Sequence, residues 1–168
     1  QGAPALVQLS PADQHRAHLG QLAALLPLAV RLGGGGEVLR SRERCGEEGG
    51  LESVAARGDA VDRLGGWAWT QPIDSGLIGR AVRERRSVMV GNVGADPDYR
   101  AAPELADVAS ELVVPLWVGE DLWGAIDVEE VRRDAFDDDD ARLLQTLADQ
   151  VGSALRSAML YERLDGAY

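Results

Sequence analysis

The chain has 168 residues, enough for one domain with a sizeable core, and its 28 acidic and 17 basic residues give a net charge of −11. Because like charges repel, this balance argues against binding to a nucleic-acid backbone or to an anionic membrane surface. The single cysteine, Cys45, excludes an intrachain disulfide and a thiolate metal cluster. We find neither a membrane-spanning run nor a signal peptide and expect a cytoplasmic protein.

The first predicted element is a helix over residues 10–26, which follows a disordered or extended segment at residues 1–9. Ser10 is a natural N-cap and Pro11 suits the first helical position. Pro27 should end or kink the helix, because proline has no amide proton and clashes with the preceding turn. One face of this helix is apolar and carries Leu19, Leu22, Leu25 and Leu26.

Short strands near 37–43 and 51–57 and a short helix at about 75–85 are predicted next. Trp69 precedes that helix. Aromatic faces stack on flat rings, so Trp69 is a candidate ligand contact, with packing in the core as the equal alternative.

The second half of the chain predicts a strand at 87–90, a long polar loop at 91–109 and a hairpin of two strands at 111–118 and 122–128. Pro115 lies inside the first hairpin strand and predicts an edge position or a bulge there.

A long helix is predicted from Asp137, which can act as its N-cap, to about Leu164. Leu143, Leu147, Leu155 and Met159 are assigned to its contact with the sheet. A second set of apolar positions, which shares Leu147 with the first, follows the three-and-four spacing of a coiled coil and, with the first helix, predicts a homodimer through a four-helix bundle. The residues expected at that dimer interface are Leu22, Leu144, Val151, Ala154 and Ala158, on a seam that also includes Leu147 and Tyr161. The alternative is a monomer in which the first helix covers the surplus face.

The order of these elements predicts an α+β sandwich, in which a central antiparallel sheet of five to six strands is flanked by N- and C-terminal helices. One domain would span residues 10–165. Four stretches in this order resemble the GAF family, a PAS-related fold: Gly76-Leu-Ile-Gly-Arg-Ala-Val82 with Ser87-Val-Met-Val90, Asp96-Pro-Asp-Tyr99, Ser110-Glu-Leu-Val-Val-Pro-Leu116, and Leu122-Trp-Gly-Ala-Ile-Asp-Val128 followed by Ala135 to Leu144.

The resemblance implies a sensory or regulatory module of a bacterial signalling protein. Such a module would bind a small molecule in a pocket on one sheet face, roofed by the loop at 91–109, and relay the signal through dimeric helices to an output domain after Tyr168. One alternative is a ligand-free dimerisation and relay domain, and a further one is a cyclic-nucleotide-binding GAF domain. The candidate ligand contacts are Trp69, Asn92, Asp96, Tyr99, Ser110 and Glu111.

We expect no catalysis and no cofactor. Some GAF-like enzymes reduce methionine sulfoxide with several cysteines, whereas Cys45 has no resolving partner and lies among acids that disfavour its thiolate. The two histidines, His15 and His18, are far from the residues that a haem or a bilin would need. The acids at 137–140 lack the glycine turn of a calcium loop, and Glu129 and Glu130 are expected to face solvent at a strand end.

Overall fold

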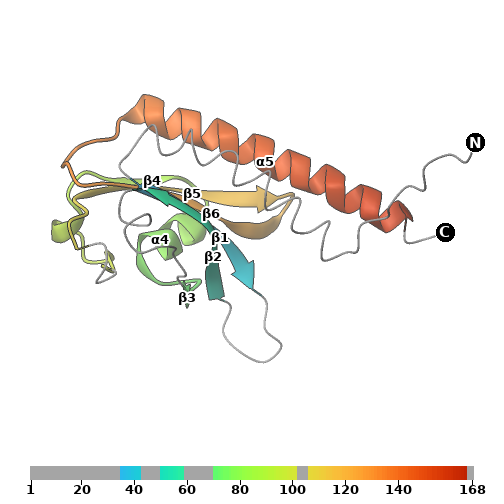
Figure 1. The fold of residues 1–168 in the computed structure, drawn as a ribbon, viewed down its shortest axis with the longest axis horizontal. Helices are drawn as coiled ribbons and strands as arrows, with labels where there is room; N and C mark the ends of the chain where they lie inside the picture. The colour runs from blue at the N-terminus through green and yellow to red at the C-terminus, as the bar shows by residue number, and fades with distance from the viewer. Residues whose placement is uncertain (1–34, 43–49, 59–69, 102–105, 166–168) are drawn as a thin grey trace, which may run out of the picture.

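A computed structural model describes residues 35–42, 50–58, 70–101 and 106–165 (Figure 1). The helix predicted at 10–26 lies outside these residues, as do Leu22, Cys45 and Trp69.

Within the described ranges, six strands form one antiparallel sheet in the order β3-β2-β1-β6-β5-β4. The predicted α+β sandwich is thus confirmed, and the predicted strands and short helix appear within a few residues of their expected ends. The strands are β1 (Gly35–Arg42), β2 (Gly50–Gly58), β3 (Thr70–Pro72), β4 (Val88–Val90), β5 (Ser110–Val118) and β6 (Asp121–Glu130).

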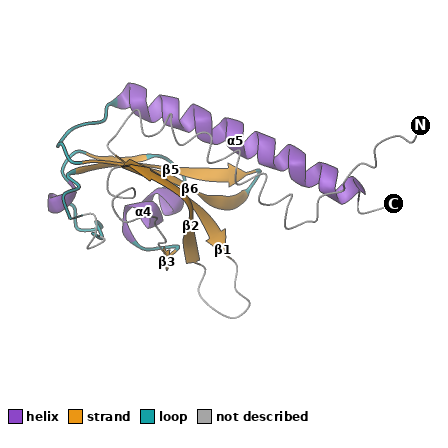
Figure 2. Ribbon diagram, in the orientation of Figure 1, coloured by secondary structure: helices purple, strands orange, loops and turns teal. Residues whose placement is uncertain are grey.

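The two faces of the sheet carry different helices, α4 (Gly76–Glu84) and α5 (Asp138–Asp165), which gives three layers (Figures 1 and 2). Alternate residues of a strand point to opposite faces, so neighbouring positions of β5 and β6 enter two separate cores. On the α5 side the buried strand residues are Leu112, Val114, Leu116, Ile126 and Val128. On the α4 side the buried cluster is Leu51, Leu77, Ile78, Ala81, Val88, Val93, Val113 and Ala125.

Pro115 lies on β5, which has β6 on one side and β4 on the other, so it does not lie on an edge strand. It is buried opposite Ala125. However, β4 pairs only with residues 111–113, and the hairpin register shifts directly after Leu116. Proline is therefore accommodated where β5 has passed the end of β4 and next to an irregularity, as its missing amide requires.

The predicted N-cap of α5 is confirmed. Asp137 Oδ1 accepts hydrogen bonds from the amides of Asp139 (2.8 Å) and Asp140 (3.1 Å), which satisfies two donors of the first turn. Among the described residues, no helix combines the length and the apolar character needed to cross a membrane.

The faces of α5 agree only in part with those predicted: Leu147 and Leu155 pack on the sheet as expected. Leu144 and Val151 are 0% and 5% exposed and pack against the sheet of their own chain, so they are not available at a dimer surface. Leu143 and Met159, expected on the sheet, are instead about two-fifths exposed, at 41% and 40%. Three residues of the predicted dimer seam, Leu144, Leu147 and Val151, thus belong to the sheet contact, because the three-and-four spacing fits two adjacent stripes of the helix. Ala154 is exposed, and the side chain of Ala158 lies outside the described residues.

Candidate functional site

Three carboxylates lie on the α4 side of the sheet, on the two strands of the β5–β6 hairpin. Glu111 and Glu129 are directly opposite each other in the register, and Val113 is opposite Asp127. Because Val113 belongs to the α4-side core, the alternation of the strands places all three carboxylates on that face. We call Glu111, Asp127 and Glu129 the carboxylate face.

The carboxylate face is withdrawn from solvent. Glu111 is 5% and Asp127 4% exposed, and Glu129 is half-buried. Each of the three takes part in an interaction within the chain. Like charges directly opposite each other destabilise a strand pair, and burial adds to that cost unless positive charge or hydrogen-bond donors compensate. The face is therefore suited to a cationic or donor-rich group.

The loop after β4 covers this side of the sheet, as expected from the sequence. It contains the 3₁₀ helix η1 (Val93–Ala95), whose Val93 is buried in the α4-side core, and Tyr99 and Val108 pack against the same core. Burial raises the pKa of the Tyr99 phenol, and the charges of Glu129, Glu111 and Asp127 raise it further. Tyr99 therefore lies within electrostatic reach of the carboxylate face and keeps its O–H as a donor.

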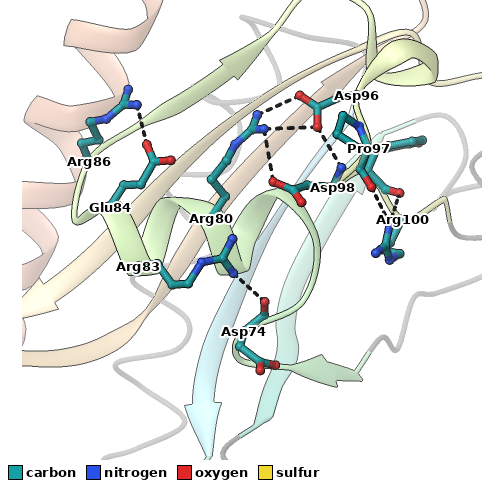
Figure 3. Close-up of polar contacts among 10 residues, drawn as sticks. Asp74, Arg80, Arg83, Glu84, Arg86, Asp96, Pro97, Asp98 and Arg100 are labelled. Atoms are coloured by element: carbon teal, nitrogen blue, oxygen red, sulfur yellow. Dashed lines mark hydrogen bonds and ion pairs between the residues drawn. The ribbon is translucent and has the colours of Figure 1, made fainter.

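Arg80 connects the loop to α4 (Figure 3). Its guanidinium donates to both carboxylate oxygens of Asp96, over 3.0 and 3.1 Å, and to Asp98 over 3.3 Å. Burial opposes ionisation of Asp96, but the hydrogen bonds from Arg80 and from the Asp98 amide, with the positive charge of Arg80, outweigh it and lower the Asp96 pKa. This planar fork is the strong form of an ion pair.

Two of the predicted ligand contacts, Tyr99 and Glu111, meet at this site. Ser110 does not join them: its position is on the α5 side, and its hydroxyl donates to the Arg132 carbonyl over 2.7 Å. Asn92 precedes η1, where its carbonyl accepts the Ala95 amide. The Asp96 carboxylate accepts hydrogen bonds from Arg80. Trp69 lies outside the described residues.

Sequence reasoning missed Asp127, Glu129 and Arg80. Glu129 and Glu130 were expected in solvent, but Glu129 is half-buried and the Glu130 side chain is 12% exposed, paired with Arg132. The available signal was the spacing of two from Asp127 to Glu129 within one strand, which puts both acids on one face. Among the described residues, no three His, Cys, Asp or Glu side chains gather as metal ligands would.

The fold and these motifs agree with a comparison against known families. A model of the GAF domain matches residues 22–156, most of the chain. The chain belongs to the GAF domain family. No curated protein matches it.

Solved structures similar to this GAF domain include free methionine-R-sulfoxide reductases and a GAF domain of a further protein. The type II free methionine-R-sulfoxide reductase of Thermoplasma acidophilum has a TM-score of 0.68 at 23% identity, covering 84% of this chain and 94% of its own. The free methionine-R-sulfoxide reductase of Neisseria meningitidis, solved with its substrate, has a TM-score of 0.64 at 22% identity, covering 94% and 97%. The second GAF domain of DevS from Mycobacterium smegmatis has a TM-score of 0.65 at 20% identity, covering 88% and 98%.

These neighbours correct one expectation. The prediction that the chain is not an enzyme is contradicted, because the structures similar to this chain include free methionine-R-sulfoxide reductases. At these identities the likeness concerns the fold alone, and the reductase activity belongs to those proteins. Fold does not determine chemistry; the residues of the site do.

Proposed function

We propose that this GAF domain is a sensory module of a bacterial signalling protein that binds a small molecule on the carboxylate face. The observation that carries the proposal is the set Glu111, Asp127 and Glu129 on one face of the hairpin, with Tyr99 within their electrostatic reach. A rigid sheet that carries polar groups under a loop is a common form of ligand site.

The charge of this face selects the class of ligand. Two opposed glutamates and a third acid favour a cationic ammonium group, which supplies up to three donors to carboxylate oxygens. A free amino acid or a related amine has such a group. The reductases with this fold act on free methionine sulfoxide, itself an amino acid, which supports the same class. Because each acid already has an interaction within the chain, the ligand must join or replace that interaction.

Thermal unfolding and titration calorimetry with paired ligands test this proposal. The probes that carry an ammonium group are the zwitterions L-methionine and L-methionine sulfoxide, and the matched controls are their N-acetyl forms, which keep the carboxylate and lack the positive charge. A ligand at a hundred times its Kd stabilises a protein by about 2.7 kcal/mol, which is measurable as a rise in Tm. Asp127→Asn should weaken binding by about ten-fold or more, since it removes a charged partner. Asp138→Asn, an exposed acid at the start of α5, should leave binding unchanged.

Two outcomes would contradict the proposal. Equal binding of the N-acetyl forms would show that the ammonium group is not recognised. Unchanged affinity in both Asp127→Asn and Glu111→Gln would place the ligand elsewhere. If no small molecule binds, the ligand-free relay domain becomes the better description.

The relay part of the proposal is a homodimer formed through α5. The sheet-facing stripe of this helix is used within the chain, so the partner must contact its flank, where Leu143 and Ala154 are exposed. Towards its C-terminal end α5 carries Met159 and Leu160, which are 40% and 53% exposed. Figure 1 shows this end reaching past the sheet. We therefore assign the second copy to this flank and this end, in place of Leu144 and Val151.

A second candidate function is methionine sulfoxide reduction at Cys45, and the likeness to two reductases favours testing it. The Cys45 thiol would take the sulfoxide oxygen, so that methionine sulfoxide becomes methionine and the thiol becomes a sulfenic acid. An external dithiol such as dithiothreitol would return the sulfenic acid to the thiol, releasing water and forming its own disulfide. Dithiothreitol-dependent formation of methionine, lost in Cys45→Ser, would establish it. Equal rates in both proteins would exclude Cys45 as the nucleophile.

A further inference from the structure

The Arg80 contact joins α4 to the loop after β4, and both of these segments also pack on the α4-side core. Leu77, Ile78 and Ala81 of α4 are buried in the α4-side core, so the helix that carries Arg80 is fixed on the sheet. From this helix, Arg80 reaches Asp96 and Asp98 (Figure 3). The side chains of Arg80 and Asp96 are 22% and 14% exposed, so water screens this pair less than it screens a surface pair.

Asp96 also shapes the turn that positions Tyr99. Its Oδ1 accepts the Asp98 amide over 3.0 Å, and its carbonyl accepts the Tyr99 amide over 3.2 Å. Arg80 thus holds the same carboxylate that closes the turn. Tyr99 follows Asp96 by three residues. Its ring packs on the α4-side core, and the charges of the carboxylate face raise the pKa of its phenol. Movement of Asp96 away from α4 would carry Tyr99 with it.

We propose that Arg80 is a latch that holds the loop at residues 91–101 on α4, and that its release opens the carboxylate face. This inference rests on the proposed function for the role of the opening, whereas the latch itself concerns the loop alone. A ligand of the carboxylate face must either pass the closed loop or bind after the hydrogen bonds between Arg80 and Asp96 have broken. Arg80 is in this sense a positioning residue and does not itself contact the carboxylate face.

Three variants separate the geometry of the fork from its charge. Arg80→Gln removes the charge and the fork, and Arg80→Lys keeps the charge but offers a single ammonium in place of two parallel donors. Arg86→Gln is the matched control. Arg86 follows the C-terminal end of the same helix, is exposed, and forms its ion pair with Glu84. None of these positions belongs to the carboxylate face.

Amide hydrogen exchange followed by NMR is the direct measurement, because it reports local opening without any ligand. In Arg80→Gln the amides of Asp98 and Tyr99 should exchange about ten-fold faster or more, as expected for loss of charged hydrogen bonds. Arg80→Lys should give a smaller increase and Arg86→Gln none. Buried α5 amides such as that of Leu147 should keep their wild-type rates in all three variants.

Two results would overturn the latch. Unchanged exchange at Asp98 and Tyr99 in Arg80→Gln would show that the loop is held without Arg80. An equal rise at Leu147 would show that Arg80 supports the whole fold and not the loop. With L-methionine as the probe, faster association in Arg80→Gln than in wild type would link the latch to the face. If wild type binds no amine, the exchange result still stands, so failure of the proposed function and failure of the latch are distinguishable.

Discussion

Gly152 of α5 lies directly against the backbone carbonyl of Trp117 on β5. A Cβ at position 152 would come within 2.1 Å of the Trp117 oxygen, a distance that no side chain tolerates without a shift of the backbone. The contact lets the helix approach the strand closely at the centre of the α5-side core, between Val151 and Leu155. It therefore sets the spacing of two layers of the fold.

The first prediction concerns that contact. Gly152→Ala would gain about 1 kcal/mol from helix propensity alone. We expect instead a net loss of about 1–3 kcal/mol in the free energy of unfolding, because the added methyl group meets backbone. Urea denaturation measures the change. Ser153→Ala, on the exposed side of the helix, is the control and should stay within about 0.5 kcal/mol of wild type. A stabilised Gly152→Ala would mean that the layers are not in close contact there.

The second prediction concerns the start of α5. Asp137→Ala removes the acceptor for the Asp139 and Asp140 amides and should cost about 1 kcal/mol of stability. Asp137→Asn retains a side-chain oxygen and should remain close to wild type. Chemical denaturation measures the free energy of unfolding of both variants. An equal decrease in Asp137→Ala and Asp137→Asn would assign the effect to the negative charge of Asp137 and not to its hydrogen bonds.

The third prediction is a pH dependence of the loop. The Asp96 pKa is lowered in the folded protein, so the contact with Arg80 stabilises the fold above the usual aspartate pKa of about 4. That contribution is lost as the pH falls through the lowered folded-state pKa. The groups that act on the pair are Asp98 on the loop and Glu84 on α4.

Carboxyl ¹³C NMR measures this titration directly. Asp96 should titrate below the usual aspartate range in wild type and return towards it in Arg80→Gln. The Arg86→Gln variant should titrate as wild type does. An Asp96 midpoint that is the same with and without Arg80 would contradict the assignment.

The fourth prediction separates the two faces of α5. Val151→Glu places a charge in the core, where Val151 is 5% exposed, and should unfold the protein or cost several kcal/mol. Ala154→Glu and Leu143→Glu lie on the exposed flank and should leave the melting temperature nearly unchanged while shifting a dimer to monomers. Sedimentation velocity at micromolar concentration, with circular dichroism as the check on folding, gives both readouts. A wild-type protein that sediments as a monomer would disprove the dimer.

Local sequence signals determined the elements of this protein and, through their order, its family. Asp137 before an apolar-periodic segment predicts the helix start correctly, and the tight turn at residues 119–121 between two apolar runs predicts the β5–β6 hairpin. Both signals depend on neighbours within a few residues of one another, where backbone propensity and capping act directly.

The tertiary structure alone decided which face of each element was used. A spacing of three and four on α5 fits two adjacent stripes, and only the sheet beneath selects Leu144 and Val151 over Leu143 and Met159. The carboxylate face likewise depends on the register that sets Glu111 opposite Glu129, about 18 residues apart along the chain. The contact of Arg80 with Asp96 spans 16 residues and needs α4 to be seated on the sheet first. Such contacts form between segments that are distant in the sequence, and the local sequence pattern of either segment does not predict them.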